Sequence, residues 1–70
     1  GLAPHVFNYN NDLLVKMFLQ DKIRYLDIVS FNEITIDKFF KKNKNIQNPN
    51  YNQIINASKW IDKNIYLGKH

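Results

Sequence analysis

Six carboxylates and two histidines are the side chains of this 70-residue chain that can hold a metal ion or act as acid and base. The carboxylates are Asp12, Asp21, Asp27, Glu33, Asp37 and Asp62. Their spacing in the sequence does not indicate that they converge on one site. His5 and His70 lie at opposite ends of a chain without cysteine, where we expect a solvated lead-in and a frayed terminus. The sequence therefore predicts no catalytic residue and no metal site.

A dinucleotide site needs a glycine-rich turn between a strand and a helix, so that the backbone can approach the pyrophosphate. The only glycines of this chain are Gly1 and Gly68. No cofactor-binding residue is therefore predicted.

Three polar side chains, Asn8, Asn11 and Asp12, stand where we expect the first helix to begin. Amide and carboxylate oxygens can accept hydrogen bonds from the free N–H groups of a helix start. The same groups can bind the backbone of an adjoining domain and hold it in place. Helix capping and domain docking both remain open for these residues.

The formal net charge of +4 and the pI near 9.5 raise the question of a polyanionic partner. Nine of the ten basic residues are lysine, beside eleven Asn and nine Ile, a bias expected from an AT-rich coding genome. Trp60, Tyr51, Tyr25 and Tyr66 could form a stacking platform for single-stranded nucleic acid, but aromatic residues at helical spacing are more often core. Nucleic-acid binding is therefore not favoured.

An independent basic module that binds RNA or an acidic protein is the alternative function, and it would use Lys41, Lys42 and Lys44. These lysines fall at the edge of a predicted loop instead of along one helix face, so a basic amphipathic membrane helix is not expected. No apolar stretch approaches the length of a membrane span.

The hydrophobic spacing predicts an all-α fold, a small bundle of three main helices with a short corner segment. We expect a lead-in at 1–9, helices at 10–20, 27–42 and 50–67, and a polar loop at 43–49. Asp27 is the expected N-cap of the second helix, Asn50 with Gln53 a capping box, and Gly68 the C-cap of the third helix, near Lys63 and Lys69.

The β-branched run at residues 34–36 alone would favour a strand, but the flanking periodicity favours a helix. Apolar side chains of Ile23, Tyr25 and Leu26 are expected to plug the corner between the first two helices. The predicted core contains Leu14, Phe18, Ile28, Phe31, Phe39, Ile54, Trp60 and Ile61.

Seventy residues make one small domain, which buries only about 60% of the surface of its unfolded chain. The chain starts at a glycine with folded-looking sequence close behind it, so we expect a piece of a larger protein.

The run Phe7-Asn8-Tyr9-Asn10-Asn11-Asp12 stands where one enzyme family has Leu-Asn-Ala-Ala-Asn-Glu. Leu14, Val15, Phe18 and Leu19 continue that pattern, and Ile23-Arg24-Tyr25 with Asp27-Ile28 follows as its Ile-x-aromatic-x-Asp-Ile corner. The chain resembles the carboxy-terminal helical domain of 1-deoxy-D-xylulose 5-phosphate reductoisomerases. Two larger residues, Tyr9 and Asn10, replace small ones, and such added volume costs about 1–3 kcal/mol where a neighbour approaches closely.

The resemblance implies a parent enzyme with an NADPH-binding domain and a central domain that holds Mg²⁺ or Mn²⁺. The parent would convert 1-deoxy-D-xylulose 5-phosphate to 2-C-methyl-D-erythritol 4-phosphate in non-mevalonate isoprenoid biosynthesis. This chain would be its noncatalytic structural domain, with the other domains as partners and a homodimeric parent allowed. The localisation implied is cytoplasmic in a bacterium, or the plastid in a plastid-bearing parasite.

Overall fold

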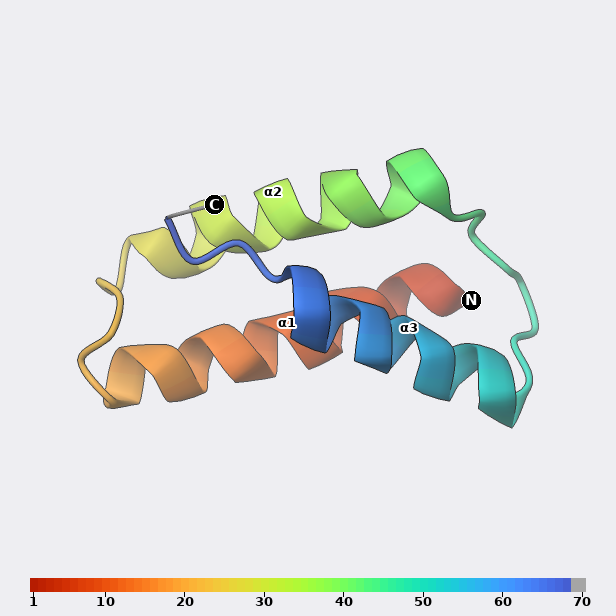
Figure 1. The fold of residues 1–70 in the computed structure, drawn as a ribbon, viewed down its shortest axis with the longest axis horizontal. Coiled ribbons are helices and arrows are strands. Elements are labelled where there is room, and N and C mark those ends of the chain that lie inside the picture. Colours follow the sequence, from red (N-terminus) through yellow and green to blue (C-terminus); the bar gives the residue numbers. More distant parts are fainter. Residues whose placement is uncertain (69–70) are drawn as a thin grey trace.

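The computed structural model describes residues 1–68 and consists of three helices, α1 (Leu2–Leu19), α2 (Asp27–Lys42) and α3 (Tyr51–Asn64). The expected all-α fold is confirmed: residues 1–68 contain no strand. Lys69 and His70 lie outside the described residues. Helices α1 and α2 run antiparallel, and α3 crosses in front of α1 in the direction opposite to α2 (Figure 1). The molecule is elongated, with extents of 35 × 20 × 17 Å.

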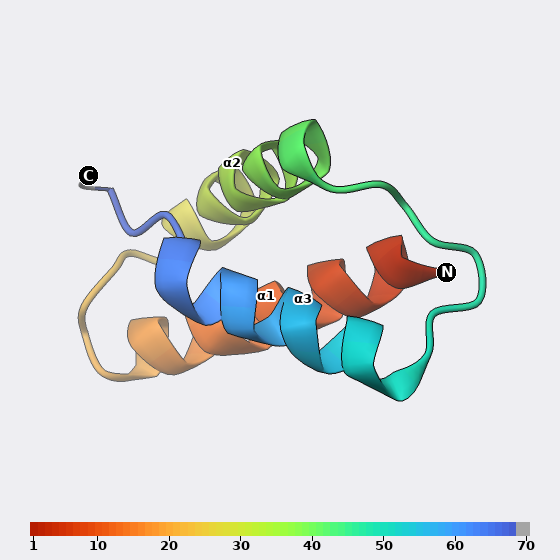
Figure 2. The ribbon, with the colours of Figure 1, turned by 45° about the vertical axis from the view of Figure 1, so that its right-hand side comes forward.

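Helix α1 begins at Leu2, so the expected lead-in at 1–9 is wrong. Gly1 at the N-cap has no side chain to offer, and the loop before α3 supplies the acceptors instead. The Leu2 N–H donates to the Ile46 carbonyl at 2.8 Å, and the Ala3 N–H donates to Asn45 Oδ1 at 3.0 Å. Pro4 fits in the first turn because an N–H there has no partner within the helix. Figure 2 shows this loop passing the N-terminus of the chain.

Helix α2 covers the expected range, but its entry differs from the prediction. Leu26 is the N-cap residue, and Asp27 is the first residue of the helix. The Asp27 carboxylate accepts from the Arg24 N–H at 2.9 Å, so it stabilises the preceding turn instead of capping its own helix. Tyr25 and Leu26 are exposed, which contradicts their expected place as a corner plug, and Ile23 is half-buried.

Helix α3 starts with the predicted capping box. The Gln53 N–H donates to Asn50 Oδ1 at 2.8 Å, and the Asn50 N–H donates to Gln53 Oε1 at 2.9 Å. The helix ends at Asn64, three residues before the expected end, because the chain turns to an extended conformation at Ile65.

The segment after α3 runs back over α2. The Tyr66 N–H donates to Thr35 Oγ1 at 2.9 Å, and the Tyr66 ring meets Phe31 edge to face. Gly68 has a positive φ of 91°, as a left-handed residue should, but it lies beyond the helix and does not cap it. A Cβ at this position would lie 3.2 Å from Phe31 Cζ.

The main core joins one side of α1 to α2 and α3. Its buried members are Leu2, Val6, Phe39, Ala57 and Ile61. Leu14 of α1 and Ile28 of α2 are also buried. The predicted core contains four of these seven: Leu14, Ile28, Phe39 and Ile61. Ala57 was not in the predicted set, and Leu2 and Val6 were missed because they fall in the supposed lead-in. Four predicted core residues are only half-buried: Phe18, Phe31, Ile54 and Trp60.

Candidate functional site

The three polar residues singled out in the sequence lie in the middle of α1, not at its start. Capping of this helix by Asn8, Asn11 or Asp12 is therefore wrong. Asn8 and Asp12 are exposed, and Asn11 is half-buried. Asn11 lines a groove of about 310 Å³ between α1 and α2, with Val15, Tyr25, Leu26, Ile28 and Val29. Domain docking by these residues stays a prediction.

Asn10, read in the sequence as an oversized replacement, is completely buried and faces α2. Its Nδ2 donates to Asn32 Oδ1 at 2.7 Å, while its own Oδ1 has no partner among the described residues. The signal for this burial was present in the sequence: Leu2, Val6, Asn10 and Leu14 recur at intervals of four, the spacing of one helix face. Because Asn10 is polar, this stripe was not recognised as one helix face, and the part of α1 before residue 10 was missed.

Tyr9, the other large replacement, faces α3. Its hydroxyl donates to Asp62 Oδ1 at 2.8 Å, and this bond raises the pKa of Tyr9. One turn earlier, His5 Nε2 lies 3.0 Å from Ser58 Oγ, whose hydroxyl can donate to the Ile54 carbonyl at 3.2 Å. Tyr9, Asn10 and His5 thus bind the helices of this domain to each other, which accounts for their size and polarity.

The carboxylates do not assemble into a metal site within the described residues, where no three His, Cys, Asp or Glu side chains come together. Asp27 pairs with Arg24, whose Nη2 lies 3.1 Å from Oδ1, and this pairing lowers the pKa of Asp27 and raises that of Arg24. Asp62 is engaged with Tyr9.

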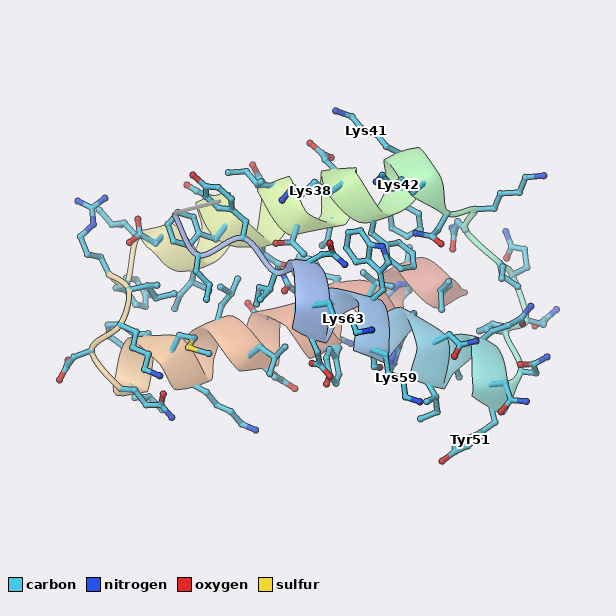
Figure 3. The ribbon with its side chains drawn as sticks, in the orientation of Figure 1. Lys38, Lys41, Lys42, Tyr51, Lys59 and Lys63 are labelled. Atoms are coloured by element: carbon cyan, nitrogen blue, oxygen red, sulfur yellow. The ribbon has the colours of Figure 1, made fainter. Side chains whose placement is uncertain are left out.

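Four lysines form a lysine face, defined as Lys38, Lys42, Lys59 and Lys63. Figure 3 shows them on the viewer's side of α2 and α3, whereas Lys41 points away from α3. The Lys38 Nζ lies 5.8 Å from the centre of the Tyr66 ring. Lys44 instead borders a cavity of about 330 Å³ that Trp60 and Phe39 help to line. The sequence trio of Lys41, Lys42 and Lys44 is therefore spread over different surfaces.

The four aromatic residues considered as a stacking platform have separate surroundings. Trp60 packs edge to face on Phe39, Tyr25 on Phe18, and Tyr66 on Phe31. Tyr51 is exposed at the start of α3, at the opposite end of the molecule from the corner that holds Tyr25 (Figures 1 and 3). Within residues 1–68, no helix has the length and apolar character needed to cross a bilayer.

Comparison with known proteins shows to which family the sequence is related. Residues 1–64 match the family model of the DXP reductoisomerase C-terminal domain. The chain belongs to this family. The reductoisomerase C-terminal domain is thus the unit whose helices, buried amide pair and lysine face are described above.

Three similar proteins are 1-deoxy-D-xylulose 5-phosphate reductoisomerases. The domain is 32% identical over 68 residues to that of Rippkaea orientalis, covering 97% of this chain and 17% of the relative. It is 37% identical over 65 residues to that of Nostoc punctiforme (93% and 16%) and 40% identical over 57 residues to that of Clostridium novyi (81% and 14%). The chain therefore spans about a sixth of the length of these relatives. No solved structure gives a significant match.

Proposed function

We propose that this chain is the noncatalytic, carboxy-terminal structural domain of a 1-deoxy-D-xylulose 5-phosphate reductoisomerase. The observation that carries the proposal is the family match over residues 1–64, combined with relatives of which the chain covers only 14–17%. The parent enzyme converts 1-deoxy-D-xylulose 5-phosphate to 2-C-methyl-D-erythritol 4-phosphate in non-mevalonate isoprenoid biosynthesis. NADPH and Mg²⁺ or Mn²⁺ bind to the other domains of that enzyme, which are the partners of this one.

The polar contacts of the domain support a structural role. Asn10 binds α1 to α2 through Asn32, and Tyr9 binds α1 to α3 through Asp62. Thr35 holds the segment after α3 against α2. These bonds link segments far apart in the sequence and make the three helices one unit, which can support neighbouring catalytic elements without contributing a reacting group.

The test is to isolate the product of the native gene, determine its intact mass and assay it. We expect a longer polypeptide that oxidises NADPH when given 1-deoxy-D-xylulose 5-phosphate and Mg²⁺ or Mn²⁺. In that polypeptide, Glu33→Gln and Asp37→Asn should leave kcat within about twofold of the parent value, because both side chains are exposed and surface substitutions of this kind have small effects. A product without this activity, or a large loss of kcat in these variants, would contradict the proposal. For a bacterial source, we place this enzyme in the cytoplasm.

The lysine face supports a second candidate, a basic module that binds RNA or an acidic protein. None of its four lysines forms an ion pair within the described residues, where Arg24 and Asp27 make the only salt bridge. If this surface binds phosphates, the Lys59→Ala, Lys63→Ala double variant should weaken binding to a single-stranded RNA and flatten its dependence on salt. Equal RNA affinity in the variant and the parent rejects this candidate.

A further inference from the structure

Large apolar side chains are exposed together on one side of the α1–α2 pair. The exposed fractions are 78% for Leu26, 69% for Tyr25, 67% for Val29 and 50% for Phe7. With the half-buried Val15, these residues are called the apolar face here. Tyr25, Leu26, Val29 and Val15 border the 310 Å³ groove that also contains Asn11. Single exposed apolar residues are ordinary on protein surfaces, whereas a contiguous group marks an interaction site.

The apolar face lies on the side of α1 that α3 does not cover. Val6 and Leu13 of α1 pack with the core cluster that includes Ala57 and Ile61 of α3. Phe7, Asn11 and Val15 follow one another at intervals of four residues, so they share a different face of the same helix. Val29 of α2 lies four residues after Tyr25, which belongs to the turn before this helix. The two-helix layer is therefore packed against a helix on one side and open on the other.

The chemistry of the apolar face selects the kind of partner. None of the six residues that line its groove carries a charge. The lysine face lies instead where α2 and α3 meet (Figure 3). A polyanion would be drawn to the lysines, whereas the apolar face offers aliphatic and aromatic surface to a protein, with the Asn11 amide as a polar contact.

The length of the relatives indicates which protein covers the apolar face. They extend over about six times the length covered here, since the chain accounts for 14–17% of each. In such an enzyme, the much larger remainder is the covalent neighbour of this helical layer and the protein with the highest local concentration around it. We infer that the apolar face of α1 and α2, centred on Val29 and Leu26, is the surface on which the remainder of the reductoisomerase packs. This inference rests on the proposed function.

Cysteine labelling tests the inference, because this domain contains no cysteine of its own. Val29→Cys and Leu26→Cys are introduced singly into the full-length reductoisomerase that carries this domain, with Tyr51→Cys as the matched control. Tyr51 is 75% exposed at the start of α3, away from the apolar face. The rate of alkylation by iodoacetamide is followed on each peptide by mass spectrometry, in native buffer and in urea. Reductoisomerase activity is measured on the same samples.

In the native enzyme we expect Val29→Cys and Leu26→Cys to react at least about tenfold more slowly than Tyr51→Cys, and all three to react alike in urea. An active enzyme in which Val29→Cys and Leu26→Cys react as fast as Tyr51→Cys overturns the docking surface and leaves the proposed function intact. A full-length protein without reductoisomerase activity overturns the proposed function and, with it, the inferred occupant.

A second pair of variants tests the docking surface independently, in case the cysteine substitutions unfold the domain locally. Val29→Lys and Tyr51→Lys place the same charge on two exposed residues. If the apolar face is covered in the enzyme, Val29→Lys lowers its thermal midpoint and Tyr51→Lys does not. Equal midpoints in the two variants contradict the docking surface, since a charge on a free surface has little effect.

Discussion

Asn10 Nδ2 donates to Asn32 Oδ1 at 2.7 Å in the buried seam between α1 and α2. The bond joins two residues that are 22 positions apart, and each amide lies among apolar neighbours on its own helix. A buried polar group without a partner is costly, so the presence of each amide depends on the other. The pair thereby specifies the register in which α1 and α2 pack.

Breaking this pair on one side should destabilise the domain more than replacing both residues. We expect Asn10→Leu and Asn32→Leu each to lower the free energy of unfolding by about 1–3 kcal/mol, because one amide is left buried and unpaired. The double variant should recover part of this loss, since no amide is then left without a partner and leucine keeps the branched shape of asparagine. Urea unfolding of the four proteins gives the coupling as a double-mutant cycle. Additive effects would show that the two amides act independently.

Removing the acceptor that the loop supplies to α1 should fray the first turn of this helix. Asn45→Ala takes away the oxygen that accepts from the Ala3 N–H at 3.0 Å. Loss of a helix N-cap acceptor costs about 0.5–2 kcal/mol. We expect faster hydrogen exchange in residues 2–5, with no change in α3. Asn48→Ala in the same loop is the control, and equal exchange in the two variants would rule out the loop as the cap.

The Thr35 hydroxyl should prove necessary for holding the segment after α3. Thr35→Val keeps the branched shape but removes the acceptor of the Tyr66 N–H, whereas Thr35→Ser keeps the hydroxyl. We expect Thr35→Val to lower the free energy of unfolding by about 0.5–1.5 kcal/mol because the Tyr66 N–H loses its acceptor, whereas Thr35→Ser loses only the contact of the methyl group. Near-ultraviolet circular dichroism should also report a loosened Tyr66 ring. The prediction fails if Thr35→Val keeps the stability and the near-ultraviolet spectrum of the parent and Thr35→Ser loses them.

The Arg24–Asp27 contact predicts a stability that decreases in acid. Two hydrogen bonds from the Arg24 side chain and one from its backbone lower the pKa of Asp27 in the folded state. The group therefore adds stability above the pKa of an unfolded aspartate, and this stability is lost as the pH falls through the lower folded value. Thermal midpoints measured from about pH 6 to pH 2 should fall less steeply for Asp27→Asn than for the parent. Asp37→Asn, which removes an exposed carboxylate of the same helix, should leave the slope of the parent unchanged.

The Tyr9–Asp62 bond predicts the opposite dependence at high pH. Because Asp62 raises the pKa of Tyr9, the bond adds stability below the pKa of an unfolded tyrosine, near 10. This stability is lost as the pH rises through the higher folded value. Asp62→Asn should bring the ionisation of Tyr9 to lower pH in a titration followed by tyrosinate absorbance. An unchanged titration would show that Asp62 does not hold the hydroxyl in solution.

Features that depend on neighbours within about one helical turn could be predicted from the sequence. The capping box of Asn50 and Gln53 spans three residues, so it could be recognised without a fold. The range of α2 followed from its apolar period, and Leu14, Ile28, Phe39 and Ile61 were recognised as buried for the same reason. The family pattern at residues 7–28 could also be recognised without a fold, because it is a run of neighbouring positions in the sequence.

Features whose partner lies far along the chain became apparent only when the three helices were seen packed together. The first turn of α1 is capped by Asn45 Oδ1, which accepts from the Ala3 N–H 42 residues away. After the end of α3, the Tyr66 N–H donates to Thr35 Oγ1 across 31 residues. Asn10 looked like a helix-entry residue until Asn32 was placed opposite it. Leu26 was expected to plug the corner until the structure placed it, with Val29, on the open side of the α1–α2 pair. The physical reason is that hydrogen-bond satisfaction and burial are properties of the neighbouring segment in space, which a local pattern does not contain.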